Sequence, residues 1–161
     1  MMNHCLASFN KLVALSLCMT ISWSSCYQNK NQESEKESIA EAVFRYQFDH
    51  CRSDTVSQVY FLALGFNTDP NEKFMQRFIG SGQTVKKFSQ SDYKGGLVTD
   101  RDTGERGIRI SVTEVRLIGD KEAEVKGACF SMFGTIRDQV YSVIKENNKW
   151  IVKNAKNILD V

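Results

Sequence analysis

The chain has 161 residues, of which 42% are hydrophobic, 25% charged and 11% aromatic, and its formal net charge is +2. This length supports one domain with its own hydrophobic core. The small net charge, without a long run of Lys or Arg, argues against nucleic acid as a partner, because phosphate binding needs clustered cations.

The first segment has the layout of a secretory signal. It contains no acidic residue before Glu33, carries Lys11, and continues with an apolar stretch over residues 12–23. As a helix this stretch would be about 18 Å long, which is short of the hydrocarbon core of about 30 Å. Its apolar residues also do not keep to one helical face. We therefore predict that residues 1–25 are a signal peptide that directs the chain across the cytoplasmic membrane.

The end of this segment, Ser24-Ser25-Cys26, resembles the lipobox of bacterial lipoproteins. The resemblance implies that the Cys26 thiol is acylated, with palmitate among its acyl chains, and becomes the new first residue. The alternative is ordinary cleavage after residues 22–24, which would release a soluble periplasmic or secreted protein. Residues 26–37 contain almost only polar side chains and are predicted to be a flexible tether. A tether favours the first outcome, a protein held in the cell envelope by a lipid anchor.

Two cysteines remain for the mature domain if Cys26 is acylated. Cys5 and Cys18 leave with the signal peptide, whereas Cys51 and Cys129 stay, in a compartment that can oxidise thiols. A disulfide between them would close a loop of about 80 residues and contribute about 4 kcal/mol. The alternative is two free thiols that pack as small hydrophobic side chains. The sequence gives no distance between the two thiols, so both states stay open.

The single domain expected over residues 38–161 begins with a helix. Ser38 is its predicted N-cap, and Glu41 completes a capping box. The apolar side chains of this helix cover a wide face, which must pack against a large surface, and a sheet is expected there. Two adjacent stripes form this face, one with Ile39, Val43, Tyr46 and His50, the other with Ala40, Phe44 and Phe48.

Three shorter elements are predicted next. Residues 57–64 read as a buried strand, because they are rich in β-branched and aromatic side chains. A second helix is expected with Asp69 as N-cap, Pro70 at the first helical position and a stop at Gly80, with Glu72 closing its capping box. Residues 85–89 are predicted to form a short strand, whose two lysines suit a sheet edge.

From Gly107 onward the pattern predicts four antiparallel strands joined by short turns. Apolar residues alternate from Ile108 to Val112 and then continue at Val115 with the opposite parity. This slip indicates a β-bulge near residues 113–114. Asn147-Asn148 is typical of a two-residue hairpin turn. The expected fold class is therefore α+β, with an N-terminal helix packed on a curved, mostly antiparallel sheet that ends in a four-stranded meander.

Two resemblances accompany this pattern. The element order over about residues 38–160, with the final hairpin at residues 145–153, resembles the NTF2-like and cystatin-like rolls. That resemblance implies a conical hollow between the helix and the sheet. Four short segments also resemble a family of small uncharacterised bacterial envelope proteins, which implies no particular activity: YFLALG at 60–65, FMQRF at 74–78, TGERG at 103–107 and the Lys149-Trp150 pair.

Chemical motifs are scarce in this sequence. His50 is the histidine left after signal removal, and it stands between Asp49 and Cys51. Consecutive helical side chains point about 100° apart, so these three do not converge on one site. We therefore predict no metal site and no cofactor, and we name no catalytic residue outside the NTF2-like alternative. In that alternative, Tyr46, Asp49 and His50 are the acid–base candidates.

Two functions are consistent with these observations. The first is a lipid-anchored envelope protein, with its domain binding another protein or a cell-wall component without catalysis. The alternative is an NTF2-like small-molecule binding protein or isomerase-type enzyme. The aromatic residues of the domain are expected in the core rather than in a ligand site, namely Phe44, Phe48, Tyr60, Phe61 and Phe74.

Overall fold

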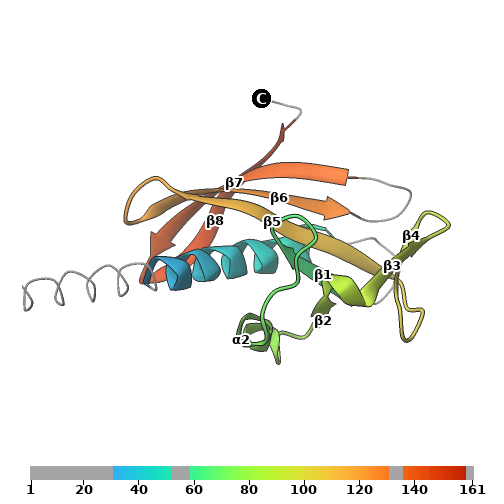
Figure 1. Cartoon of the computed structure of the whole chain (residues 1–161). Helices are drawn as coiled ribbons and strands as arrows, with labels where there is room; N and C mark the ends of the chain where they lie inside the picture. The colour runs from blue at the N-terminus through green and yellow to red at the C-terminus, as the bar shows by residue number, and fades with distance from the viewer. Residues whose placement is uncertain (1–30, 52–58, 131–135, 159–161) are drawn as a thin grey trace, which may run out of the picture. The chain divides into compact units, whose positions relative to one another are not determined.

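The computed structural model describes residues 31–51, 59–130 and 136–158, so the predicted signal peptide, Cys26 and the turn after residue 130 lie outside the described residues. The fold is α+β, as predicted. In the described chain a helix over residues 31–50 accompanies a six-stranded mixed sheet of order β2-β1-β5-β6-β7-β8 and a two-stranded sheet, β3-β4 (Figure 1). The strands are β1 (Val59–Leu64), β2 (Thr84–Lys87), β3 (Ser91–Lys94), β4 (Leu97–Asp100), β5 (Gly107–Leu117), β6 (Glu122–Phe130), β7 (Ile136–Glu146) and β8 (Lys149–Asn157).

The N-terminal helix begins earlier than predicted. Residues 31–37 are already helical, so Ser38 lies inside the helix and the predicted N-cap there is wrong. Glu, Lys and Gln of this segment are good helix formers, and helical propensity here outweighs the lack of an apolar face. Glu37, which the sequence assigns to the tether, forms an ion pair with Arg77 at 2.8 Å. The folded part of the chain therefore begins before Ser38.

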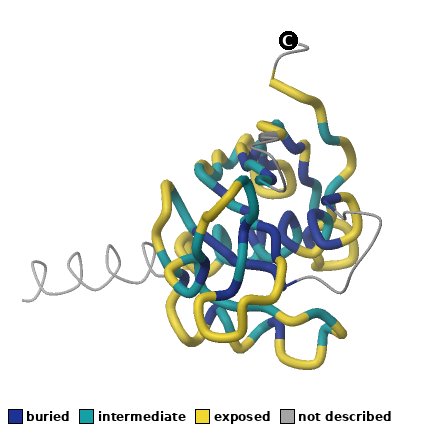
Figure 2. The backbone as a smooth tube through the Cα atoms, turned by 90° about the vertical axis from the view of Figure 1, so that its right-hand side faces the viewer, coloured by how far each residue is buried: buried dark blue, intermediate teal, exposed yellow. Residues whose placement is uncertain are grey.

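The buried face of this helix differs from the prediction at its C-terminal end. Tyr46 is half-buried and His50 is exposed, whereas Gln47 is fully buried. Residues four apart stay nearly in line on a helix, so Gln47 continues the line of Ile39 and Val43. In the backbone view coloured by burial, buried residues gather toward the middle of the fold, and exposed residues lie mostly on the loops around it (Figure 2).

The five aromatic residues expected in the core are all buried. On the helix side of the sheet, Phe44 meets Phe74 and Phe78 edge to face, with ring centroids 5.9 and 6.1 Å apart. Edge-to-face pairs place the positive ring edge on the negative ring face and add to the free energy of burial. This aromatic cluster joins the N-terminal helix to the short helical segment that follows β1.

That segment, α2 (Glu72–Met75) and the 3₁₀ turn η1 (Gln76–Phe78), is capped differently from the prediction. The N-cap is Asn71, whose side-chain oxygen accepts a hydrogen bond from the Phe74 amide at 2.8 Å. Asp69 instead accepts hydrogen bonds from the Ser89 amide and hydroxyl at 2.8 and 2.5 Å. Both carboxamide and carboxylate side chains suit an N-cap, and local sequence does not distinguish two candidates this close together.

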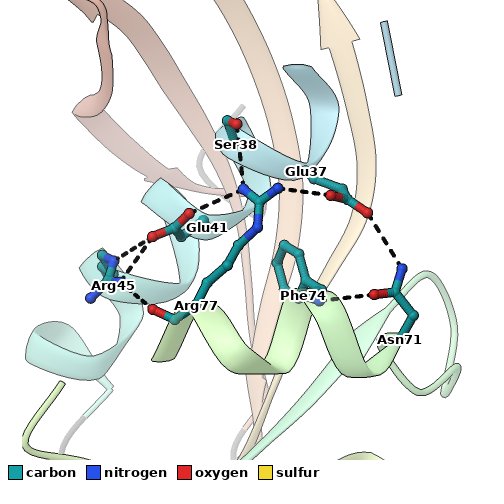
Figure 3. Close-up of polar contacts among 7 residues, drawn as sticks. All are labelled: Glu37, Ser38, Glu41, Arg45, Asn71, Phe74 and Arg77. Atoms are coloured by element: carbon teal, nitrogen blue, oxygen red, sulfur yellow. Dashed lines mark hydrogen bonds and ion pairs between the residues drawn. The ribbon is translucent and has the colours of Figure 1, made fainter. Parts of the chain in front are cut away.

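Arg77 connects the N-terminal helix to η1 (Figure 3). Its Nη2 lies 2.8 Å from Glu37 Oε2, and its Nη1 lies 3.2 Å from Glu41 Oε2. Nη1 also donates to the Ser38 hydroxyl at 3.4 Å, and the Arg77 carbonyl accepts a hydrogen bond from Arg45 Nη2 at 2.7 Å. We call these five residues the Arg77 cluster. Ser38 and Glu41, predicted as a capping box, thus form tertiary contacts with Arg77 instead.

Replacing Arg77 with alanine is expected to lower the free energy of unfolding by about 1–2 kcal/mol, because it removes several charged hydrogen bonds and the packing of the side-chain stem. Urea unfolding measures the change. Arg116→Ala is the matched control: Arg116 also pairs with a glutamate, at 2.7 Å, but its side chain is 59% exposed against 22% for Arg77. The control should change stability by less than about 0.5 kcal/mol. Equal effects of the two substitutions would contradict a stabilising role of the Arg77 cluster.

The main sheet contains two parallel pairings that the sequence did not predict. β1 pairs in parallel with both β2 and β5, whereas the β5–β8 meander is antiparallel as expected. Residues 59–63 of β1 are all buried. Burial of both faces is typical of parallel strands, which need cover on each side. The short strand β2 lies at the sheet edge as predicted, but it covers residues 84–87, and residues 88–89 of the predicted strand belong to a 3₁₀ turn.

The predicted bulge in β5 is confirmed. Val112 pairs with Gly127 and Glu114 with Lys126, so Thr113 is the extra residue. The bulge returns Val115 to the side of the sheet that packs on the helix. The predicted turn at Asn147-Asn148 is also confirmed, with φ of 48° and 62°.

The hairpin of β3 and β4 was not predicted. It turns at Gly95-Gly96, where φ is 58° and 83°. Val98 of β4 is buried with Val59 and Phe61 on the side of the main sheet that faces away from the helix. We call this side, which carries Phe61, Arg109, Ser111 and Ala128, the outer face. The described part of the chain contains no helix that is long and apolar enough to cross a bilayer.

Candidate functional site

A hollow of about 470 Å³ opens on the outer face of the main sheet. Its floor contains Ala63, Ser111 and Ala128, which are neighbours across β1, β5 and β6 in one row of the sheet. Because these side chains are small, the floor lies below the larger side chains around it. The volume falls in the range of small-molecule sites, about 300–1,000 Å³. We call this hollow the outer pocket.

Aromatic and aliphatic side chains form most of the walls. Phe66 and Phe88 stand on the β1–β2 side, Phe130 lies on β6, and Ile158 follows β8. Phe66 is 86% exposed and Ile158 is 41% exposed. Large apolar side chains that remain exposed beside a hollow are a feature of binding surfaces.

Three charged side chains also line the outer pocket. The Lys126 ammonium pairs with Glu114 at 2.8 Å, so its charge is already matched. Asp138 on β7 is exposed and lies beside Ala128 in the sheet register. Arg109 on β5 has no ion-pair partner among the described residues. The pocket therefore combines an apolar lining with one cation whose charge is not matched by a contacting carboxylate.

The Arg109 side chain is held in place by its neighbours. Its Nε donates a hydrogen bond to the Ser91 hydroxyl at 2.7 Å, and Nη2 donates to the Ser91 carbonyl at 3.3 Å. The guanidinium also lies 4.6 Å from the centroid of the Phe88 ring. Burial lowers the pKa of Arg109, against the attraction of Asp92, because it removes water from the charged form. The group stays charged at neutral pH, because a guanidinium is effectively always protonated in proteins.

Gln47 supports the pocket floor from the helix side of the sheet. Its Nε2 donates hydrogen bonds to the carbonyls of Ser111 and Ala128, at 3.4 and 3.3 Å, and to the Tyr141 hydroxyl at 3.0 Å. The two carbonyls belong to residues whose side chains form the floor. Burial raises the pKa of Tyr141, so the phenol stays protonated at neutral pH. A buried amide thus joins the helix to the backbone beneath the outer pocket.

The acid–base candidates from the sequence lie elsewhere. The rings of Tyr46 and His50 stack with centroids 3.7 Å apart, and Asp49 and His50 are exposed. His50 Nδ1 lies 2.8 Å from the Tyr46 carbonyl oxygen, near the C-terminal end of the helix. None of the three lines the outer pocket. A catalytic role for Tyr46, Asp49 and His50 stays a prediction.

Cys51 and Cys129 are free and buried in this structure. A hydrogen bond between the two thiols and burial both raise the pKa of Cys129. The two side chains are therefore close neighbours, although they are far apart in the sequence. The disulfide between them stays a prediction, and this proximity is compatible with it.

In the folded, reduced protein we expect iodoacetamide at pH 8 to modify Cys51 and Cys129 at least about a hundredfold more slowly than after unfolding, because both thiols are buried and inaccessible to the reagent. Peptide mass spectrometry measures each site. The same labelling of protein unfolded in denaturant without reductant tests the disulfide, because two cysteines joined by a disulfide have no free thiol to modify. Rapid modification of the folded protein would contradict the packing described here.

Among the described residues, no group of three or more His, Cys, Asp or Glu is placed so that it could bind a metal ion. Sequence reasoning missed the outer pocket and Arg109. One signal was available: Arg109 stands between Ile108 and Ile110, so strand alternation places it on the opposite face from the core. Neither Phe88 nor Ser91 could be assigned to Arg109 from local pattern, because Phe88 lies in a 3₁₀ turn and Ser91 begins β3 of the two-stranded sheet.

A scan of protein-family models and searches of curated proteins and of solved structures found no match to this chain. The candidate site therefore rests on the sequence and geometry of this chain alone.

Proposed function

We propose that this chain is a lipid-anchored protein of the bacterial cell envelope whose domain binds a ligand in the outer pocket. The layout of residues 1–26 supports the anchor: a short apolar stretch followed by Ser24-Ser25-Cys26. Cys26 is the proposed site of acylation. A domain held near a membrane surface is placed to capture a ligand there.

The observation that carries the binding role is the outer pocket itself. It joins a floor of small side chains to the exposed ring of Phe66 and to one cation, Arg109, held by two hydrogen bonds. Concave apolar sites with few fixed polar groups are typical of ligand binding. The proposed function is recognition of a ligand and includes no chemical step.

The finer assignment of the fold, an NTF2-like or cystatin-like roll, is also part of the proposal. A helix against a sheet that ends in a bulged meander supports it. The alternative function, an NTF2-like binding protein or isomerase-type enzyme, would place its hollow between helix and sheet. Phe44, Phe48 and Tyr60 are buried in that space, so we favour the outer face as the binding site.

We expect Cys26→Ala to move the protein from the membrane fraction to the soluble fraction, because a diacyl anchor supplies the membrane affinity. Cell fractionation measures the change, and the mass of the N-terminal peptide identifies the acyl chains. Cys18→Ala is the matched control and should leave the protein on the membrane. An unmodified N-terminus upstream of Cys26, or wild-type protein free in the periplasm or medium, would overturn the anchor.

A further inference from the structure

We propose that the outer pocket binds a small amphipathic carboxylate, with the carboxylate on Arg109 and the apolar body against Phe66, Phe130 and Ile158. This inference rests on the proposed binding role of the pocket and adds the chemical class of the ligand. A medium-chain fatty acid is the simplest member of that class.

The first step of the argument is the charge of Arg109. Ser91 and Phe88 fix the guanidinium through two hydrogen bonds and a ring contact, but all of these partners are neutral. No acidic side chain among the described residues forms an ion pair with Arg109. Asp92 attracts the guanidinium without forming an ion pair, and this attraction offsets only part of the cost of burying the cation. An anion from a ligand in direct contact with Arg109 would offset more of that cost. The guanidinium is already oriented, so little side-chain entropy is lost on binding.

The second step is the number of negative charges that the pocket can accept. Lys126 is matched by Glu114 at 2.8 Å, which leaves one cation for the ligand. Asp138 lines the same pocket and would repel further negative charge. A monoanion such as a carboxylate therefore fits better than a doubly charged phosphate. Asp138 also sets the orientation of the ligand, because it favours the uncharged end of the ligand on its own side of the pocket floor.

The third step is the lining beyond Arg109. Ala63 and Ala128 leave room above the floor, and Phe66, Phe130 and Ile158 offer apolar surface around it. Covering the exposed ring of Phe66 and the exposed side chain of Ile158 would remove apolar area from water. A ligand that combines an apolar body with one carboxylate would satisfy both parts of the pocket.

The test is photolabelling of the intact protein in phospholipid nanodiscs with decanoic acid that carries a diazirine, and with the matching decanol. We expect the acid to label peptides of the outer pocket at least about tenfold more strongly than the alcohol, since one charge-assisted contact contributes a tenfold change or more. Excess decanoate should compete. Arg109→Gln should abolish the preference for the acid, whereas the control Arg116→Gln, on the same strand and outside the pocket, should retain it.

Asp138→Asn keeps the test decisive if Arg109→Gln fails to fold. Asp138 is exposed, so its replacement should leave stability unchanged and increase labelling by the acid a few-fold by removing a repulsion. Equal labelling by acid and alcohol, unchanged in Asp138→Asn, would overturn the carboxylate while leaving the pocket as a binding site. Absence of label from the pocket with both probes would overturn the pocket as the binding site as well.

Discussion

Gly107→Ala is expected to destabilise the protein by about 3 kcal/mol, the largest effect among the single substitutions considered. A Cβ at this position would lie 2.4 Å from Cε2 of Phe61 and 2.5 Å from the Val59 carbonyl oxygen. Phe61 is fully buried, and Val59 belongs to the strand that pairs with Gly107. Neither can move without breaking the β1–β5 pairing, so overpacking here costs more than at a pliable site.

Urea or thermal unfolding of the variant measures this loss. Gly119→Ala is the matched control, because a Cβ there meets no atom within 4 Å. The control should stay within about 0.5 kcal/mol of the wild type. If Gly107→Ala were equally mild, the close parallel pairing of β1 with β5 at Val59 would be wrong.

Asp100→Ala is expected to cost about 2–3 kcal/mol at pH 7. The Asp100 side chain is fully buried, and its Oδ2 lies 2.5 Å from the ammonium of Lys86 on β2. Oδ1 accepts hydrogen bonds from the amides of Asp102 and Thr103, at 2.9 and 3.3 Å. Removal of one member of a buried ion pair leaves the other charge unmatched. Lys86 is partly exposed, which limits the cost.

Asp100→Asn separates the two roles of this side chain. It can keep an oxygen for the two amides but loses the charge that matches Lys86, so about half of the destabilisation should remain. Urea unfolding of both variants measures the split. An asparagine variant as stable as the wild type would show that the ion pair contributes nothing.

The effect of Asp100 should also depend on pH. Burial raises the pKa of this carboxyl, but the Lys86 ammonium and the backbone amides lower it by more, so the net direction is downward. A lowered pKa in the folded state gives stability that is present above the pKa of the unfolded chain, about 3.9, and is lost as the pH falls through the folded value. The difference between wild type and Asp100→Ala should therefore be constant above about pH 5 and shrink below about pH 4. Urea unfolding of both proteins from pH 3 to 7 measures this difference in the free energy of unfolding. A difference that stays constant over that range would contradict the lowered pKa of Asp100. The same pair raises the pKa of Lys86, whose contribution is lost only as the pH rises through its folded value.

Much of the fold was predictable where the signal is local. Alternation in β5, the parity slip at Thr113 and the Asn147-Asn148 turn each depend on neighbours in the sequence, and each was confirmed. The same holds for the apolar face of the N-terminal helix at Ile39, Ala40, Val43, Phe44 and Phe48. Local pattern failed where two candidates compete within a few residues. Asn71 rather than Asp69 caps α2, and Gln47 rather than His50 continues the buried face.

The sequence by itself therefore determined the α+β class, the antiparallel meander of the last four strands and the position of the bulge, because the period of apolar residues follows from backbone geometry. Only the tertiary structure decided the parallel pairing of β1 and the outer pocket. The pocket brings together Phe66, Arg109 and Ile158, which come from three separate segments of the chain. Contacts of this kind depend on sheet register and on how segments pack over the outer face. The periodicity of apolar residues in the sequence specifies neither of these.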